Sequence, residues 1–195
     1  MKKTDKPLAA KICLWAGISL LVVGVLVLAY WQLHTRFWAQ KSESYVETLR
    51  TLMPSPQDSI PEERRENAMS VLSLDETDFI GILEMPRYEA SLPVCADWEC
   101  FAKFPCQFAG SIYDGTLQIG ATSQIGQYDF YREISVGDLV RFTDVAGNRY
   151  TYTITNLRYE KHADSTTLNR EDSALTLFIK NVYDFEYLIV FCNAI

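Results

Sequence analysis

An uninterrupted apolar segment near the N-terminus constrains this chain more than any other feature. No side chain in residues 12–33 is charged, and 22 residues at about 1.5 Å per residue give a helix of roughly 33 Å. The hydrocarbon core of a bilayer is about 30 Å thick, so this helix is long enough to cross it. A cleaved signal peptide is the alternative, but the segment is longer than the apolar part of such peptides and no small-residue cleavage site follows it. We therefore predict an uncleaved transmembrane helix.

The charged residues beside this segment differ between its two sides. Four lysines precede it, whereas the residues after it carry both signs of charge, among them Arg36, Lys41, Glu43 and Glu47. Because basic residues favour the cytoplasmic side, we predict that residues 1–11 are cytoplasmic and that the chain after residue 33 lies outside the cell membrane. The net charge is -7 and no later stretch is basic, which argues against a nucleic-acid partner.

The segment between the membrane and the predicted domain is expected to be helical in two pieces. The spanning helix should continue outward until two prolines that follow Met53 end it. A capping box that opens at Ser59 predicts a second, short helix that ends near Val71. We therefore assign residues 34–77 to an extracellular stalk and linker and residues 78–195 to one folded domain.

The folded domain has the pattern of a β protein. Tyr150, Tyr152 and Ile154 alternate with threonines, which is the period of two that a half-buried strand requires. Gly147 and Asn148 predict the turn of a hairpin between two of the strands. The expected strands are residues 79–83, 117–119, 138–143, 149–157, 174–181 and 187–192. So many short strands with few and short helices predict a mainly β fold, a closed or nearly closed barrel without exposed edges.

Three of the five cysteines, Cys95, Cys100 and Cys106, are close in sequence. In an extracellular domain they allow one disulfide, and a zinc site is the less favoured alternative because no histidine is near and only three thiols are present. We expect no metal and no cofactor. Cys192 is predicted to be a packed core thiol, since it is five residues after Tyr187 and therefore points to the opposite face of the last strand.

Short motifs follow one another along the predicted domain in an order that carries a family resemblance. They include GILEMP at 81–86, LPV at 92–94, Gly110-Ser111 with Tyr113, LQI at 117–119, VGD at 136–138, FTD at 142–144, Gly147-Asn148, LTLF at 175–178 and Val190-x-Cys192. In this order they resemble the sortases, the membrane-anchored cysteine transpeptidases of Gram-positive bacteria, over about residues 79–195. The resemblance implies a sortase-like barrel on the cell surface.

The resemblance also implies a catalytic His, Cys and Arg, and this chain has other residues at all three aligned positions. Thr122 stands at the His position, Lys180 at the Cys position and Tyr187 at the Arg position, with Ser123 after Thr122. In the family a thiolate attacks the substrate carbonyl, an imidazole moves protons and a guanidinium stabilises the oxyanion. Since the replacements supply none of these groups, we expect no catalytic residue. Thr122, Ser123, Lys180 and Tyr187 then become candidates for lining a ligand groove.

Three hypotheses about function follow. The favoured one is a pseudoenzyme that binds a peptide, a pilin or an active sortase as an accessory to surface-protein or pilus assembly. The second is an active sortase-type transpeptidase or peptidase with a relocated nucleophile. That enzyme would also need a base, and the two histidines are His34 at the membrane interface and His162 in a predicted solvated loop. The third is a structural ectodomain with a filled groove.

Overall fold

The computed structural model describes residues 6–58, 69–162, 173–184 and 186–195 of the 195-residue chain, and it divides into two compact units. The first unit ends at Phe37 and the second begins at Trp38. The helix predicted to open at Ser59 falls largely on residues outside these described ranges.

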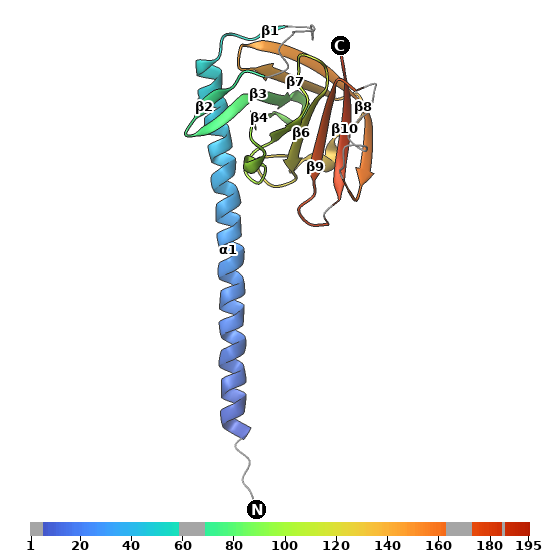
Figure 1. Ribbon diagram of the computed structural model, residues 1–195. Helices are drawn as coiled ribbons and strands as arrows, with labels where there is room; N and C mark the ends of the chain where they lie inside the picture. The colour runs from blue at the N-terminus through green and yellow to red at the C-terminus, as the bar shows by residue number, and fades with distance from the viewer. Residues whose placement is uncertain (1–5, 59–68, 163–172, 185) are drawn as a thin grey trace, which may run out of the picture. The chain divides into compact units, whose positions relative to one another are not determined.

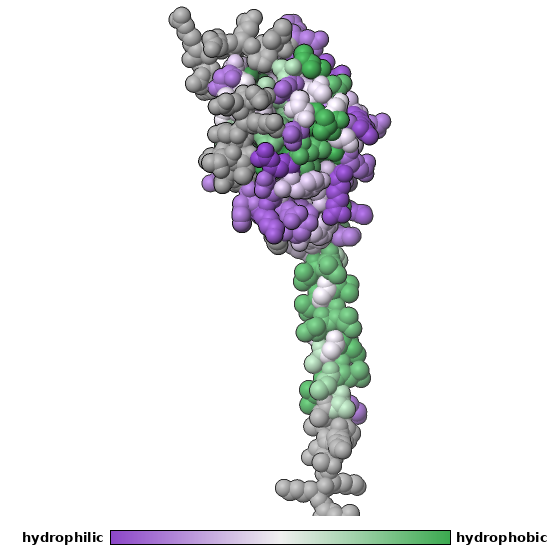
Figure 2. Space-filling model, turned by 90° about the vertical axis from the view of Figure 1, so that its right-hand side faces the viewer, coloured by the Kyte–Doolittle hydropathy of each residue, from purple (hydrophilic) through white to green (hydrophobic). Residues whose placement is uncertain are grey.

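Helix α1 (Lys6–Leu52) supplies the whole described part of the first unit. Its most apolar stretch of 18 residues has a mean hydropathy of 2.7, and no side chain of that stretch is buried. Figure 2 shows apolar side chains around the helix on the face in view. By length and composition this helix is able to cross a membrane, which agrees with the predicted span.

The second unit is built on a closed β-barrel (Figure 1). Among the described residues, eight strands form a ring in the order β3-β4-β5-β6-β9-β10-β8-β7, and β7 closes it by pairing with both β8 and β3. The two remaining strands, β1 and β2, extend from β8 and β3. The mainly β barrel predicted from the sequence is therefore confirmed.

The bounds of the elements are close to those expected. The strands are β1 (Gln57–Asp58), β2 (Leu72–Leu74), β3 (Thr77–Met85), β4 (Ala90–Cys95), β5 (Cys106–Ala109), β6 (Leu117–Thr122), β7 (Leu139–Asp144), β8 (Asn148–Glu160), β9 (Leu175–Lys180) and β10 (Tyr187–Ala194). Short 3-10 helices are η1 (Pro86–Tyr88), η2 (Trp98–Cys100) and η3 (Tyr131–Glu133). The predicted hairpin is the antiparallel pair β7 and β8. Strands β1, β2 and β5 were not predicted, and they are only two, three and four residues long.

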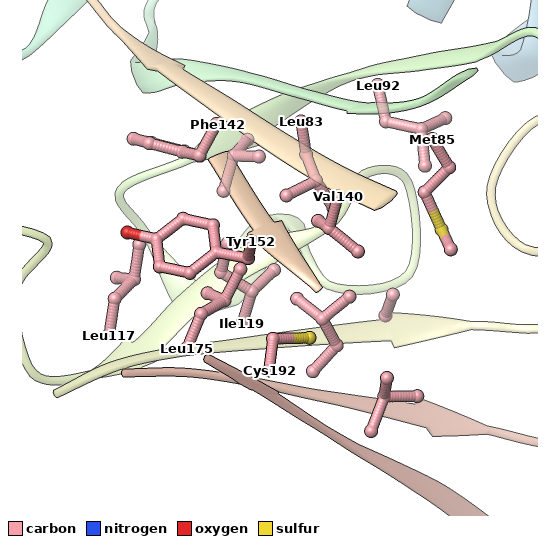
Figure 3. Close-up of a cluster of buried hydrophobic side chains, with 14 of the residues drawn as sticks. Leu83, Met85, Leu92, Leu117, Ile119, Val140, Phe142, Tyr152, Leu175 and Cys192 are labelled. Atoms are coloured by element: carbon pink, nitrogen blue, oxygen red, sulfur yellow. The ribbon is translucent and has the colours of Figure 1, made fainter. Parts of the chain in front are cut away.

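Alternate residues of the strands fill the barrel interior (Figure 3). Along β9, Leu175, Leu177 and Ile179 belong to the interior cluster, whereas Phe178 belongs to a separate cluster on the outside. This alternation follows from the strand geometry, in which successive side chains point to opposite faces. The inward-facing set is almost wholly aliphatic and aromatic, which makes the interior a packed core.

The C-terminal part of α1 packs against the barrel within the second unit. Tyr45 and Leu49 of the helix join Phe79 and Phe104 of the barrel in one buried cluster, and Leu49 has no exposed surface. Tyr45 also contacts Phe79 and Phe104 ring to ring, with centroids 5.1 and 5.6 Å apart. The compact unit therefore begins at Trp38, within the residues 34–77 that the sequence assigned to a stalk and linker. These helix residues bury their apolar side chains against the barrel.

Candidate functional site

The ends of three neighbouring strands bring together the positions at which the sequence resemblance implied catalytic groups. Thr122 at the end of β6 pairs with Lys180 at the end of β9, and Lys180 pairs with Tyr187 at the start of β10. Neighbouring strands are about 4.7–4.9 Å apart, so the three residues form a row. They point to the outside of the barrel, because their inward-pointing neighbours belong to the interior core: Ala121, Ile179 and Leu188.

Thr122 is held in the row from the adjoining loop. Its backbone N–H donates to Gln127 Oε1 at 2.9 Å, and its carbonyl accepts from the Tyr128 N–H at 3.2 Å. The side chain is buried, and its Oγ1 has no hydrogen-bond partner among the described residues. Lys180 and Tyr187 are half-buried. The row thus offers one tightly packed hydroxyl, one ammonium and one phenol.

Ser123 serves the fold through its hydrogen bonds. Its N–H donates to the Lys180 carbonyl at 3.0 Å, and its Oγ accepts from the Val182 N–H at 3.2 Å and donates to Asn181 Oδ1 at 3.4 Å. The same Oδ1 accepts from the Tyr183 N–H at 3.0 Å. Ser123 and Asn181 are both buried, so this network ties the end of β6 to the turn after β9.

An aromatic patch lies beside the row on the outside of β6 and β9, and we define it as Trp98, Phe101, Phe108 and Phe178. The Phe178 ring contacts Trp98 and Phe108, with centroids 5.9 and 5.2 Å away, and Trp98 stacks on Phe101 at 4.4 Å. Phe178 is buried, but Trp98 and Phe108 remain 40% and 45% exposed. The patch therefore presents two partly exposed rings on a buried base.

A glycine makes this arrangement possible. Gly120 is two residues before Thr122 on the same outward face, and a Cβ at this position would lie 2.6 Å from atoms of both Phe178 and Trp98. The missing side chain lets the indole lie close to the strand. The sequence prediction missed this patch, although the aromatic residues at 98, 101 and 108 were a usable signal in a segment that was considered only for its cysteines.

The thiols are poorly placed to act as nucleophiles. Cys192 points into the barrel interior, as predicted, and burial raises its pKa (Figure 3). Cys95 and Cys106 are buried in the cluster under α1, where a hydrogen bond with Cys106 and then burial raise the pKa of Cys95. Cys100 packs against the same cluster, and burial raises its pKa also. Since the thiolate is the reactive form, thiols with raised pKa values are weak nucleophiles at neutral pH.

The structure also places the other residues considered for chemistry. All five cysteines are free thiols, and the described residues contain no cluster of three or more His, Cys, Asp or Glu side chains suited to a metal ion. His162 is exposed just after β8, and His34 is in the first unit. In the part of the chain that the structure describes, this site offers contact surface and hydrogen bonds.

Comparison with known proteins identifies the fold of this chain through solved structures of low sequence identity. No family model and no curated protein matches the chain. Among solved structures, it is similar to sortase A from Corynebacterium diphtheriae, lid mutant, with 19% identity and a TM-score of 0.52 over 62% of this chain and 72% of that one. Sortase C1 from Streptococcus agalactiae matches with 16% identity and a TM-score of 0.52, over 63% of this chain and 70% of that one.

A third similar structure is sortase C from Clostridium perfringens with the C-terminal cell wall sorting motif. It has 15% identity and a TM-score of 0.51, over 60% of this chain and 71% of that one. At these identities the similarity establishes the architecture alone, and the activities of those enzymes do not transfer with it. Together with the eight-strand ring and the apolar N-terminal helix, the comparisons show that this chain has the sortase fold.

Proposed function

We propose that this protein is a membrane-anchored, non-catalytic member of the sortase fold that binds a peptide segment of another surface protein. The observation that carries the proposal is the row of Thr122, Lys180 and Tyr187, three adjacent positions without a thiol, an imidazole or a guanidinium. Acyl transfer by a cysteine enzyme needs a nucleophile within hydrogen-bond reach of a base. The row contains no such pair.

The aromatic patch supports binding as the remaining activity. Partly exposed rings on a rigid base bury a large area at small entropic cost, so they suit apolar side chains of an extended peptide. The ammonium of Lys180, next to the patch along β9, suits a peptide carbonyl or carboxylate. A pilin or another surface protein is a fitting source of such a segment, and an active sortase is the alternative partner.

Catalysis is tested with the protein purified in detergent and a panel of LPxTG-like peptides with an amine acceptor. Mass spectrometry should detect neither cleaved nor transferred product and no thioacyl adduct. Product that disappears in Cys95→Ala, Cys100→Ala or Cys106→Ala would reveal a relocated nucleophile and overturn the non-catalytic assignment. Product that disappears only in Cys192→Ala would assign that role to a thiol inside the barrel.

Binding is tested by calorimetry with the same peptides. Trp98→Ala should weaken binding by about tenfold or more, since aromatic anchors commonly contribute 2 kcal/mol or more at interfaces. Tyr159→Ala on β8 is the matched control, because Tyr159 is an exposed aromatic residue outside the patch. Equal affinities of both variants and the unchanged protein would remove the patch from the proposed function.

The proposed location rests on the charge bias around the apolar helix. The lysines before it favour a cytoplasmic N-terminus, which puts the barrel on the outer surface of the membrane. Protease added to intact cells should digest the barrel region and leave an N-terminal tag protected. Protection of the barrel in intact cells, with digestion after lysis, would reverse the topology. Co-purification of the tagged full chain from its native host would then identify the partner.

A further inference from the structure

A cavity of about 790 Å³ lies within the second unit, between the end of α1, the start of β4 and the loop 125–130. We refer to it as the helix cavity. It shares no lining residue with the row of Thr122, Lys180 and Tyr187 or with the aromatic patch. Its volume falls in the range of about 300–1,000 Å³ that is typical of ligand pockets.

Close contacts build the walls of the helix cavity. Gly126 approaches Ala39 of α1 so closely that a Cβ on Gly126 would lie 2.4 Å from the Ala39 Cβ, and Gly126 has φ +81°. On another side Tyr88 and Phe130 stack with ring centroids 4.6 Å apart and an interplanar angle of 16°. These contacts define the shape of the cavity on two of its sides.

The charge of the lining is strongly one-sided. Four carboxylates line the helix cavity: Glu43, Glu47, Glu89 and Asp129. Among the described lining residues Arg50 is the single basic side chain, and it is neutralised by Glu84, whose Oε1 is 2.6 Å from its Nη2. A concave surface lined by one sign of charge focuses the field and attracts the opposite charge. The helix cavity therefore favours a cationic ligand.

Two buried polar groups in the lining have no hydrogen-bond partner within the part of the chain that the structure describes. Ser42 and Gln127 both line the helix cavity and are 3% and 2% exposed, and neither Ser42 Oγ nor Gln127 Nε2 makes a hydrogen bond. Buried polar groups in folded proteins are nearly always hydrogen-bonded, so each such exception needs an explanation. An amide N–H of this kind suits a peptide carbonyl, and a hydroxyl suits either a donor or an acceptor.

One edge of β4 borders the helix cavity. Ala90, Ser91 and Leu92 line it, and they pair with β3 on one side. On the other side β4 meets β5 at Cys95 alone, so no described strand pairs with this edge from Ala90 to Leu92. An unpaired strand edge is a template for an extended peptide, which adds to the sheet through backbone hydrogen bonds.

We propose that the helix cavity binds an extended peptide segment that carries lysine or arginine side chains. The β4 edge aligns the peptide backbone, Gln127 and Ser42 take its polar groups, and the carboxylates of α1 hold its cationic side chains. This site is distinct from the proposed binding surface, because none of its lining residues belongs to the row or to the aromatic patch.

The test uses the full chain in detergent and a fluorescently labelled peptide of alternating alanine and lysine, with an alanine–glutamate peptide for comparison. The lysine peptide should bind with saturation and the glutamate peptide should not. The double variant Glu43→Gln/Glu47→Gln should bind the lysine peptide roughly threefold to tenfold more weakly, because exposed ion pairs are individually weak. The matched control is Glu99→Gln/Glu160→Gln, which removes two carboxylates that do not line the helix cavity.

Three outcomes would overturn the proposal. Equal losses in both double variants would mean that the peptide follows the net charge of the protein. A loss of binding in Trp98→Ala would place the lysine peptide at the aromatic patch. Competition by spermidine at the same concentration as the peptide would show that the ligand is a small polyamine and that the β4 edge plays no part. If Trp98→Ala still binds the lysine peptide and Glu43→Gln/Glu47→Gln binds it more weakly, the helix cavity is supported, and this result does not depend on the proposed function.

Discussion

The inner and outer faces of strands β6, β9 and β10 carry different kinds of side chain. On the inside of β6, β9 and β10, residues such as Ile119, Leu177 and Val190 form an apolar core. On the outside, Thr122, Lys180 and Tyr187 occupy positions where the fold resemblance implied catalytic groups. Because successive residues of a strand point to opposite faces, substitutions on one face leave the other largely unchanged. The architecture and the chemistry of this barrel are therefore encoded by separate sets of alternating residues.

The most direct test of this difference between the two faces is to change one residue on each face of β9. Leu177→Ala should lower the free energy of unfolding by about 2–5 kcal/mol, because it leaves a cavity in the packed interior. Lys180→Ala, three residues later on the outer face, should change it by about 0.5 kcal/mol or less. Urea denaturation of the two variants measures both values, and similar losses would mean that the outer row is part of the stabilising core.

A second substitution tests whether the aromatic patch depends on the missing side chain at position 120. Gly120→Ala should cost about 1–3 kcal/mol, because the added methyl group would lie 2.6 Å from atoms of Phe178 and Trp98. The Trp98 fluorescence should also shift as the indole moves away from the strand. Gly137→Ala gives the opposite case, since nothing lies within 4 Å of a Cβ there and its cost comes from a φ of +95°, so it should leave the Trp98 environment unchanged. An unchanged emission spectrum in Gly120→Ala would mean that the patch accommodates the methyl group.

A buried carboxylate just before β7, Asp138, makes the stability of the barrel depend on pH. Burial alone would raise the pKa of Asp138, but hydrogen bonds from Tyr88, Arg87 and the Ser135 N–H lower it overall. A carboxyl group with a lowered folded-state pKa stabilises the fold above its unfolded pKa of about 3.9, and this contribution is lost as the pH falls through the folded value.

Asp138→Asn should therefore cost about 1–2 kcal/mol at pH 7, a value reduced because Arg87 is largely exposed. The variant should also lose less stability than the unchanged protein between pH 5 and pH 3. Thermal melts across this range give the measurement. Parallel curves for the two proteins would show that Asp138 contributes nothing to acid sensitivity.

The smallest expected effect concerns the row itself. Thr122 Oγ1 is buried without a partner, so Thr122→Val removes an unsatisfied group and should raise the free energy of unfolding by up to about 1 kcal/mol. Ser123→Ala breaks the bonds to Asn181 and Val182 and should lower it by about 0.5–1.5 kcal/mol. Opposite changes in the free energy of unfolding for these two neighbours would show that the Ser123 hydroxyl stabilises the fold and that the Thr122 hydroxyl does not. A destabilised Thr122→Val would show that the hydroxyl has a role in the fold.

The fold could be predicted from the sequence because its main signals are local. Residue spacing within a single strand predicts the alternation around Tyr152 and the inward position of Cys192. Two adjacent residues predict the turn at Gly147. The aromatic patch and the docking of α1 could not be predicted in this way. Trp98 lies over Gly120, 22 residues later, and Tyr45 packs on Phe79 and Phe104, so these contacts depend on how distant segments meet in space.

Gln127 gives the molecule a means of communication between two surfaces. Its Oε1 accepts the hydrogen bond from the Thr122 N–H, while its side chain also lines the helix cavity. A ligand that rotated this amide would break the hydrogen bond at the end of β6, where the outer row begins. By thermodynamic linkage the effect would be reciprocal, so a ligand that immobilised the row would change the affinity of the helix cavity by the same factor. The two proposed sites, joined through one amide side chain, would then respond cooperatively to two segments of a partner.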